Sequence, residues 1–492
     1  MNQNKAPLYE ALLTYERKKN VSFHVPGHKD GTIFDGQAKE RYAAVLAMDG
    51  TEVEGLDDLH HPRGAIADAQ QLAAEAFGAD QTFFLVGGST AGNLAAALSL
   101  CDAGDCIIVQ RNAHKSVFNG LLLAEAHPVF VFPNVEPETG VALGLTDADV
   151  SPALQAYPDA KAVWITNPNY YGMGQDIKKI AHVCHRAGVP LIVDEAHGAH
   201  FGQSANVPVS ALASGADLVV QSTHKMLTSM TMSSMLHVKG DLIPRERLAA
   251  VLAMIQSSSP SYPLMASLDV ARRHLVIEGR KILYRTVERL ENKREQIQSE
   301  LTCLSIYGGG SHVFSRDPLK WVVTCKHPSV SGYRLLTWLQ EMGCIAEMAD
   351  TRNVVLVFSI DINDIYIDKL HTALLRIDET IRNSSSLEEQ DIPISDTVAV
   401  FAKPGTVSEV TMSLRTSFMS TRKIVPIEQA IGCYCAEMVI PYPPGIPLLL
   451  PGESIMPHHL EAIRHIREAG GVFQGAADDE MKTIAVLSKK QL

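Results

Sequence analysis

Two residues of this chain have the types and spacing that covalent cofactor chemistry needs. Lys225 ends the polar run Ser222-Thr223-His224-Lys225, and Asp194 ends the apolar run Leu191 to Asp194. A lysine can hold an aldehyde cofactor as a Schiff base, and a carboxylate can keep a pyridine nitrogen protonated. The pair therefore suggests pyridoxal phosphate (PLP). Each residue alone is ambiguous, since an acid after a strand often caps the next helix and a lone lysine is usually surface charge.

A third element adds a place for the phosphate group. The run Thr82 to Val86 reads as a strand, and it leads through Gly87, Gly88, Ser89 and Thr90 into a helical pattern. Glycines let the backbone approach a ligand, and the free N–H groups at a helix N-terminus favour an anion. This turn is an ordinary helix cap when taken alone, so the prediction of a phosphate-binding turn depends on its combination with Lys225 and Asp194.

The elements that must position these residues alternate between apolar strands and amphipathic helices. A helical pattern covers Asp176 to Ala187, and the predicted strands are Cys106 to Gln110, Val129 to Phe132, Ala162 to Thr166, Leu191 to Asp194 and Asp217 to Gln221. This alternation predicts an α/β fold with a mostly parallel sheet and helices on both faces. Ligands of such folds bind at the carboxyl ends of the strands, where all the candidate chemistry lies.

The chain is long enough for more than one domain. A charged amphipathic run from Leu268 to Leu301 predicts a long connecting helix, and a smaller α+β segment follows it. Residues 383–391 form a candidate polar linker. We therefore expect a cofactor-binding large domain over 1–290, a small α+β domain over 291–382 and a C-terminal domain over 383–492.

Composition narrows the class of protein and its partners. The 492 residues carry a formal net charge of −12 and 46% hydrophobic residues. An acidic chain repels nucleic acid and anionic membranes, so neither is an expected partner. The eight cysteines include no CxxC pair, which favours free thiols in a reducing compartment over a disulfide framework or a zinc site. No apolar signal or membrane segment is recognised, so we expect a cytoplasmic protein.

An ordered set of motifs resembles the ornithine/lysine/arginine decarboxylase family, whose members have the PLP fold type I of aspartate aminotransferase. The resemblance covers nearly the whole chain. It runs through FHVPGHKDG (Phe23 to Gly31), GLDDLHHP (Gly55 to Pro62), GGST, RNAHKS (Arg111 to Ser116), TNPNYYG (Thr166 to Gly172), DEAHGAH (Asp194 to His200), STHK and YPPGIPLLLPGE (Tyr442 to Glu453).

The resemblance implies a role for each matched residue. Lys225 becomes the Schiff-base lysine, Asp194 the partner of the pyridine nitrogen, His114 the imidazole stacked on one face of the ring, and Ala196 the small residue on the other face. One position departs from the family pattern, because Met232 stands where many relatives carry glutamine. The other residues expected to line the cofactor pocket are Ser89, Thr90, His197, Ser222 and His224.

The resemblance also implies a substrate and an assembly. It points to decarboxylation of a basic amino acid, with lysine and arginine ahead of ornithine, in polyamine biosynthesis, by a homodimer or a higher even oligomer. Family members that act in acid stress carry an N-terminal wing domain, which this chain is expected to lack. A cationic substrate requires a carboxylate at the far end of the pocket. Glu453 and Asp57 or Asp58 are the candidates, although the two aspartates could simply fix a turn.

Several alternatives are open at this point. His197 and His200 spell H-x-x-H, but they lack the four-residue spacing that places two imidazoles on one helix face, so we expect no metal. Asp194-Glu195-Ala196-His197 spells the DEAH box of helicases, yet the chain contains no Gly-Lys dipeptide and therefore no P-loop. Aminotransfer, aldol cleavage on the same fold, and a non-catalytic PLP-binding relative are not excluded by Lys225 and Asp194.

Overall fold

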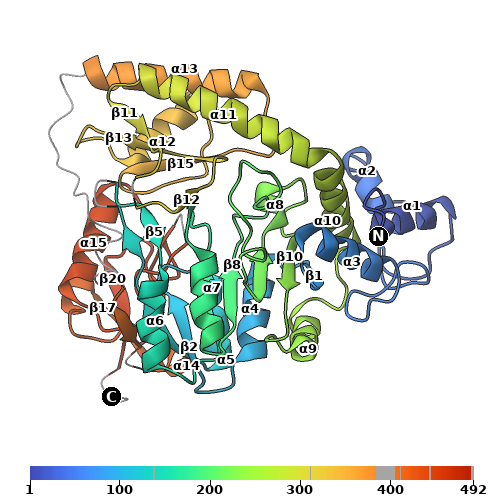
Figure 1. Ribbon diagram of the computed structural model, residues 1–492, viewed down its shortest axis with the longest axis horizontal. Coiled ribbons are helices and arrows are strands. Elements are labelled where there is room, and N and C mark those ends of the chain that lie inside the picture. Colours follow the sequence, from blue (N-terminus) through green and yellow to red (C-terminus); the bar gives the residue numbers. More distant parts are fainter. Residues whose placement is uncertain (137–138, 311, 384–404, 411, 443–444, 489–492) are drawn as a thin grey trace.

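The centre of the computed structural model is an eight-stranded sheet (Figure 1). The structure describes residues 1–136, 139–310, 312–383, 405–410, 412–442 and 445–488. The strands lie in the order β1 (Gln81–Leu85), β10 (Ser234–Val238), β9 (Leu218–Gln221), β8 (Leu191–Asp194), β6 (Val163–Thr166), β2 (Cys106–Gln110), β3 (His127–Val131) and β16 (Val407–Glu409).

Most neighbouring strands of this sheet are parallel. The run from β9 through β8, β6 and β2 to β3 is parallel throughout, whereas β10 is antiparallel to both β1 and β9, and β16 is antiparallel to β3. Strand β1 thus points the same way as β9. The carboxyl ends of β1, β9, β8, β6 and β2 therefore meet at one edge, which confirms the predicted fold class.

Helices cover both faces of the sheet because both faces are apolar. Alternate residues of one strand enter different cores: Val193 of β8 packs with one cluster of buried side chains and Ile192 with the other. The first cluster includes residues of α3 (Ala65–Phe77), α6 (Asp147–Ala156) and α7 (Ile177–Arg186). The second includes residues of α4 (Gly88–Leu100), α5 (Lys115–Ala124) and α9 (Arg245–Ile255).

The predicted long helix leads out of this domain. It consists of α10 (Tyr262–His274), one π-helical turn η1 (Leu275–Gly279) and α11 (Arg280–Glu300), without a break between them. Gly279 lies in the π turn, and a side chain there would come within 3.5 Å of the Ile360 side chain of the next domain. The long helix therefore has its π turn where two parts of the chain pack closely.

A second, antiparallel sheet follows the long helix. It contains β11 (Leu304–Ile306), β13 (Lys320–Cys325), β15 (Asn353–Val357) and β14 (Met348–Ala349), and α12 (Gly332–Glu341) and α13 (Asp364–Asn383) belong to the same segment. The two-residue strand β12 (Ser315–Arg316) pairs with β7 (Met173–Gly174) of the large domain. This pairing ties the small segment to the region beside the carboxyl ends of the large sheet.

The C-terminal residues form a further core around α15. The elements are α14 (Leu414–Met419), β17 (Arg422–Pro426), η2 (Ile427–Gln429), β18 (Ile440–Tyr442), α15 (Pro457–Glu468), β19 (Val472–Gln474) and β20 (Thr483–Leu487). Strand β17 pairs with β20, and β18 pairs with β19. The predicted linker after Asn383 lies outside the described residues, and the three domain boundaries stay predictions.

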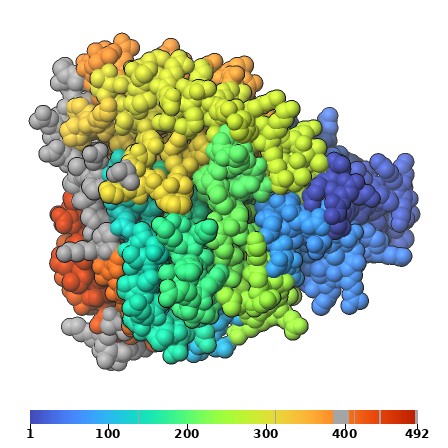
Figure 2. Space-filling model, viewed as in Figure 1, coloured from blue at the N-terminus to red at the C-terminus, as the bar shows by residue number. Residues whose placement is uncertain are grey.

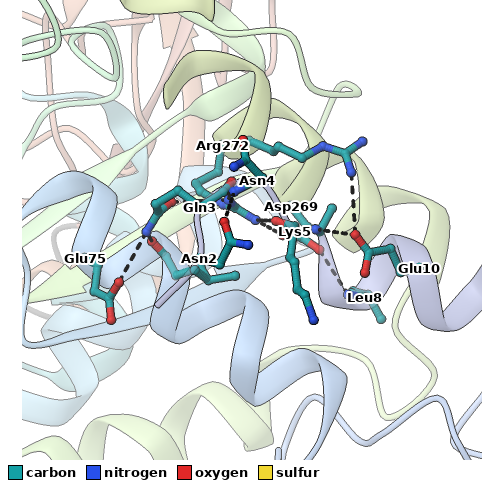
Figure 3. Close-up of polar contacts among 12 residues, drawn as sticks. Asn2, Gln3, Asn4, Lys5, Leu8, Glu10, Glu75, Asp269 and Arg272 are labelled. Atoms are coloured by element: carbon teal, nitrogen blue, oxygen red, sulfur yellow. Dashed lines mark hydrogen bonds and ion pairs between the residues drawn. The ribbon is translucent and has the colours of Figure 1, made fainter. Parts of the chain in front are cut away.

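The N-terminal segment projects from the body of the molecule (Figure 2). It contains α1 (Pro7–Arg17) and α2 (Lys39–Ala47). Arg272 of α10 holds its beginning in place by donating to the carbonyl oxygens of Gln3 at 2.7 Å and Lys5 at 2.6 Å (Figure 3). Asp269 accepts from Arg272 at 2.6 Å and from the Leu8 amide at 3.0 Å. No helix among the described residues is long and apolar enough to cross a bilayer.

Candidate active site

Asp194 and Lys225 come together at the carboxyl edge of the large sheet. Asp194 is the last residue of β8, and it lies opposite Val220 of the parallel strand β9. Strand β9 ends at Gln221, and the short helix α8 (Thr223–Met226) follows at once, so it carries Lys225 to the same edge. The apolar strand sequences thus account for the position of both residues.

These residues line a cavity of about 390 Å³. All the residues that the sequence placed around the cofactor are in its wall, together with several that the sequence did not single out. The lining residues are Gly87, Gly88, Ser89, Thr90, Asn93, His114, Ser116, Thr166, Pro168, Tyr170, Asp194, Ala196, His197, Ser222, His224, Lys225, Thr231, Met232, Glu347, Met348 and Tyr442. Their individual roles stay predictions.

Asp194 is a buried carboxylate that receives hydrogen bonds from neutral groups. Its side chain is almost inaccessible, and it accepts from Asn93 Nδ2 at 3.0 Å and from the Ala196 amide at 3.1 Å. Burial raises the pKa of Asp194, while the Asn93 hydrogen bond and the charge of Lys225 act in the opposite direction. A cationic N–H group placed against this carboxylate would stabilise its charged form.

Lys225 lines the cavity, and its side chain is exposed to it. Nζ lies 3.1 Å from His197 Nε2 and 5.8 Å from the centre of the Tyr170 ring. Desolvation of the amine by the surrounding protein lowers the pKa of Lys225. The negative charges of Asp194 and Glu347 partly offset this effect. A lysine with a lowered pKa is a better nucleophile near neutral pH.

His114 is both a helix cap and part of the cavity wall. It precedes α5, and its Nδ1 accepts from the Ser116 amide at 3.2 Å and lies 2.7 Å from Ser116 Oγ. The neutral ring therefore carries its proton on Nε2. Burial lowers the pKa of His114 to about 4, so the ring is neutral at neutral pH. Asn93 Nδ2 also donates to Ser116 Oγ at 2.9 Å, which links His114 through two side chains to Asp194.

The predicted phosphate-binding turn lies at the N-terminus of α4. No side chain caps this helix, so the first amides of α4 have no side-chain acceptor. Ser89 Oγ lies 2.6 Å from Ser222 Oγ, which joins the turn to the residues before Lys225. Gly88 has φ +69° and donates its amide to the Met232 carbonyl at 2.8 Å. An anion can bind to the amides that follow Gly88 at this helix end.

The two acids proposed for the substrate do not belong to the described cavity wall. Asp57 accepts from the amides of Gly64 at 2.8 Å and Ile66 at 3.0 Å and thereby holds the start of α3. Glu453 forms an ion pair with the buried Arg111 at 2.9 Å and accepts from the Leu450 amide at 2.8 Å. Both carboxylates have structural partners within the chain, so their substrate roles find no support in this geometry.

Glu347 is one of the lining residues that the sequence analysis missed. It directly precedes β14 of the small sheet and is exposed to the cavity. Met348 lines the cavity beside it, and Tyr442 comes from the C-terminal part of the chain. No motif of the sequence analysis includes Glu347 or Met348, whereas Tyr442 begins the YPPGIPLLLPGE run. Only the packing of the second sheet against the carboxyl edge of the first brings Glu347 to the site.

The two histidines of the H-x-x-H run face different partners. His197 Nε2 contacts Lys225, whereas His200 Nε2 lies 2.9 Å from Asp317 Oδ1 in a fully buried pair. The two imidazoles therefore do not converge on one point. Among the described residues, no cluster of three or more histidine, cysteine or acidic side chains could hold a metal ion.

Comparison with known proteins identifies the family. The Orn/Lys/Arg decarboxylase major domain matches residues 6–315, and the C-terminal domain of the same family matches residues 401–475. The chain belongs to this family. It is 40% identical to the uncharacterized protein YaaO of Bacillus subtilis and 36% identical to the arginine decarboxylase of Halalkalibacterium halodurans, over 99% of both chains in each case.

Solved structures of family members share the fold. The constitutive lysine decarboxylase of Escherichia coli superposes with a TM-score of 0.81 at 22% identity, over 99% of this chain and 82% of that chain. At this identity the likeness shows the fold alone. The predicted family and its α/β fold are thus confirmed by independent comparisons of sequence and structure.

Proposed function

We propose that this chain is a PLP-dependent decarboxylase of a basic amino acid, with arginine as the first candidate substrate and lysine and ornithine after it. The observation that carries the proposal is the position of Lys225 and Asp194 in one cavity at the carboxyl edge of the sheet. Family membership supports decarboxylation over aminotransfer or aldol cleavage. The relative named arginine decarboxylase matches at 36% identity over nearly full length, which favours arginine.

The residues of the cavity fit PLP. Asp194 receives hydrogen bonds from the neutral donors Asn93 and Ala196, so the protonated ring nitrogen of the cofactor supplies the missing cationic partner. The uncapped amides of α4 suit the phosphate group, and Lys225 suits the aldehyde. When bound, PLP supplies a conjugated cationic ring that accepts the electron pair left on Cα after CO2 departs.

The chain's own groups hold the protons that this chemistry requires. Asp194, buried and oriented by Asn93, would keep the ring nitrogen of bound PLP protonated. His114 packs as a neutral imidazole whose Nδ1 is occupied by Ser116, so its Nε2–H is available as a donor. Lys225 lines the cavity and would hold the aldehyde of bound PLP, and its amine is a candidate to return a proton to Cα.

Glu347 is our candidate for recognition of the cationic side chain. Glu347 and Asp194 are the two carboxylates among the described lining residues. In this proposal Asp194 pairs with the ring nitrogen of PLP, which leaves Glu347 for the substrate. A guanidinium or ammonium group inside a cavity needs a carboxylate partner, because an unpaired buried charge is costly. Glu347 comes from the small sheet, so it can face the distal end of a substrate whose α-carbon lies at Lys225.

A competition experiment tests the function. Arginine, lysine and ornithine are offered together to the PLP-loaded protein, and the products are identified by mass spectrometry. We expect agmatine and CO2 in excess over the diamines. Formation of keto acids or aldehydes instead would favour aminotransfer or aldol cleavage, and absence of any product would favour a non-catalytic PLP-binding protein.

The same assay tests Glu347. We expect Glu347→Gln to raise KM for arginine by about 10- to 100-fold, since a hydrogen bond to a charged group contributes about 1.5–3 kcal/mol. Glu341→Gln, an exposed change on α12, is the matched control and should leave KM unchanged. An unchanged KM in Glu347→Gln would remove Glu347 from substrate recognition.

The homodimer is also part of this proposal. The projecting N-terminal segment exposes several large apolar side chains, and exposed apolar clusters of this kind mark protein contacts. Phe23 is 92% exposed, and Val21, Val25, Ile33 and Tyr42 are each more than half exposed. A second copy of this chain is the partner that the fold family suggests, with the symmetric contact typical of homodimers.

Phe23→Asp tests the dimer. We expect the parent chain to sediment as a dimer and the variant to shift toward monomer, because a buried unpaired carboxylate opposes association. Phe314→Asp, at another exposed phenylalanine, should leave the parent's assembly unchanged. A parent monomer would contradict the proposal.

A cytosolic location and a role in polyamine supply complete the proposal, and the eight free cysteines agree with a reducing compartment.

A further inference from the structure

The amine of Lys225 makes one described hydrogen bond, and its partner is a histidine. Lys225 Nζ and His197 Nε2 lie 3.1 Å apart. An ammonium group has donors only, so His197 Nε2 accepts whenever Lys225 is protonated. His197 is held in this position by the turn after β8 and by the Tyr170 ring, whose centre lies 4.8 Å away at an interplanar angle of 57°.

The surroundings of His197 keep its ring neutral while Lys225 carries the proton. His197 is 5% exposed, and its Nδ1 has no hydrogen-bond partner among the described residues. Protonation would therefore bury a charge on a ring whose Nδ1–H has no acceptor to disperse it. Burial first, and then the neighbouring positive charges, lower the pKa of His197 well below its ordinary value.

The charged and titratable groups around the pair act on it in opposite directions. Asp194 and Glu347 favour a proton on Lys225. Lys320, whose buried Nζ donates to the Tyr170 carbonyl at 3.1 Å, disfavours a proton on His197, and His114 and His224 act in the same direction. Two basic nitrogens 3.1 Å apart cannot both be charged, so His197 and Lys225 share one proton.

We propose that His197 is a catalytic base that takes a proton from Lys225 Nζ when this amine must act as a nucleophile. The inference rests on the proposed function. During cofactor attachment, the Lys225 ammonium gives one proton to His197 Nε2, and its freed electron pair forms a bond to the PLP aldehyde carbon. The aldehyde oxygen leaves as water with the two protons that remain on Nζ, which completes the carbon–nitrogen double bond. The proton on His197 passes to solvent.

The rate of cofactor attachment tests this role without any amino acid present. PLP is added to the full-length apoprotein, and attachment is followed by stopped-flow absorbance and by borohydride trapping at Lys225. His197→Gln keeps a hydrogen-bond acceptor but cannot take a proton. We expect attachment to be about 10²-fold slower in this variant near neutral pH, as is typical for loss of a general base. The difference should narrow at high pH, where Lys225 loses its proton to solvent.

The controls separate chemistry from packing. His200→Gln alters a buried histidine of the same turn that contacts Asp317, so it should lower the melting temperature without slowing attachment. His197→Asn is the second variant if glutamine prevents folding, and it should be similarly slow. Attachment within about threefold of the parent rate at all pH values in either folded variant would overturn the proposal, since general acid–base groups contribute far more. Failure of the decarboxylase proposal would appear differently, as normal attachment in the parent without release of CO2.

Discussion

Two of the places where this chain brings cationic and acidic side chains together differ in how these groups are paired. At the N-terminal anchor, Arg272 and Asp269 are fully buried 2.6 Å apart, and two backbone carbonyls and the Leu8 amide add hydrogen bonds to the pair (Figure 3). At the cavity, Lys225 makes one hydrogen bond within the described part of the chain, to a neutral histidine, and Asp194 accepts from neutral donors. The first group is paired within the chain except at Arg272 Nε, whereas under the proposed function the second would be completed by the cofactor.

This difference separates stability from chemistry. A buried ion pair whose hydrogen-bonding groups are largely matched within the chain contributes mainly when it is intact, because removal of one partner leaves the other charge buried. Groups that remain under-coordinated keep the altered pKa values that a catalyst needs. Substitutions at the two places should therefore affect different measurements.

The largest expected effect is loss of activity in Lys225→Ala. Decarboxylation should fall by at least about 10³-fold, because the nucleophile that attaches the cofactor is removed. The variant should lose the visible absorbance of attached PLP but keep the parent's melting temperature, since Lys225 makes few contacts. Lys178→Ala, on the exposed face of α7, is the control. A borohydride-stable adduct in Lys225→Ala would move the attachment to another lysine.

The reverse result is expected for Arg272→Met. Loss of the guanidinium leaves Asp269 buried and two carbonyl oxygens without their donor, so the free energy of unfolding should fall by about 3–5 kcal/mol. Arg273→Met is the neighbouring control: its half-buried pair with Glu10 spans 3.7 Å and should cost about 1 kcal/mol or less. Urea denaturation measures both. Equal losses in the two variants would mean that the anchor contributes little.

The smallest expected effect is a pH dependence of stability caused by Glu195, the acid next to Asp194. Glu195 accepts from the Ala211 amide at 2.8 Å and from Gln221 at 2.7 Å in a fully buried site, and burial raises its pKa to about 8. The unfolded carboxyl ionises near pH 4.5, so the folded chain binds the extra proton between these values and its stability falls as pH rises through this window.

Glu195→Gln should remove that pH dependence. Relative to the parent, the variant should gain about 2 kcal/mol of unfolding free energy between about pH 6 and about pH 8. Asp194→Asn, the same change one residue earlier, should instead lower turnover by about 10²-fold, because the ring nitrogen loses its charged partner. A pH-independent difference between Glu195→Gln and the parent would show that Glu195 is ionised in the folded protein.

Local patterns in the sequence predicted the parts of the site that follow strands. Asp194, Lys225 and the turn before α4 each come directly after an apolar run, so their common edge followed from the parallel order of the strands. Glu347 could not be found in this way, because it reaches the cavity only through packing of the small sheet. The position of Glu453 could not be predicted from sequence either, because its ion pair with Arg111 joins residues from distant parts of the chain.

The π-helical turn at Leu275–Gly279 has a consequence for the long helix that joins the two sheets. A π turn corresponds to one inserted residue in an α-helix. Each residue of an α-helix turns the chain by about 100°, so deletion of one residue here would rotate α11 by about that angle relative to α10. The residues of α11 that are now buried, among them Leu283, Val287 and Leu290, would then point elsewhere. The inserted residue therefore sets the rotation of α11 relative to α10. With this rotation, one unbroken helix can bury its apolar residues first against one domain and then against the next.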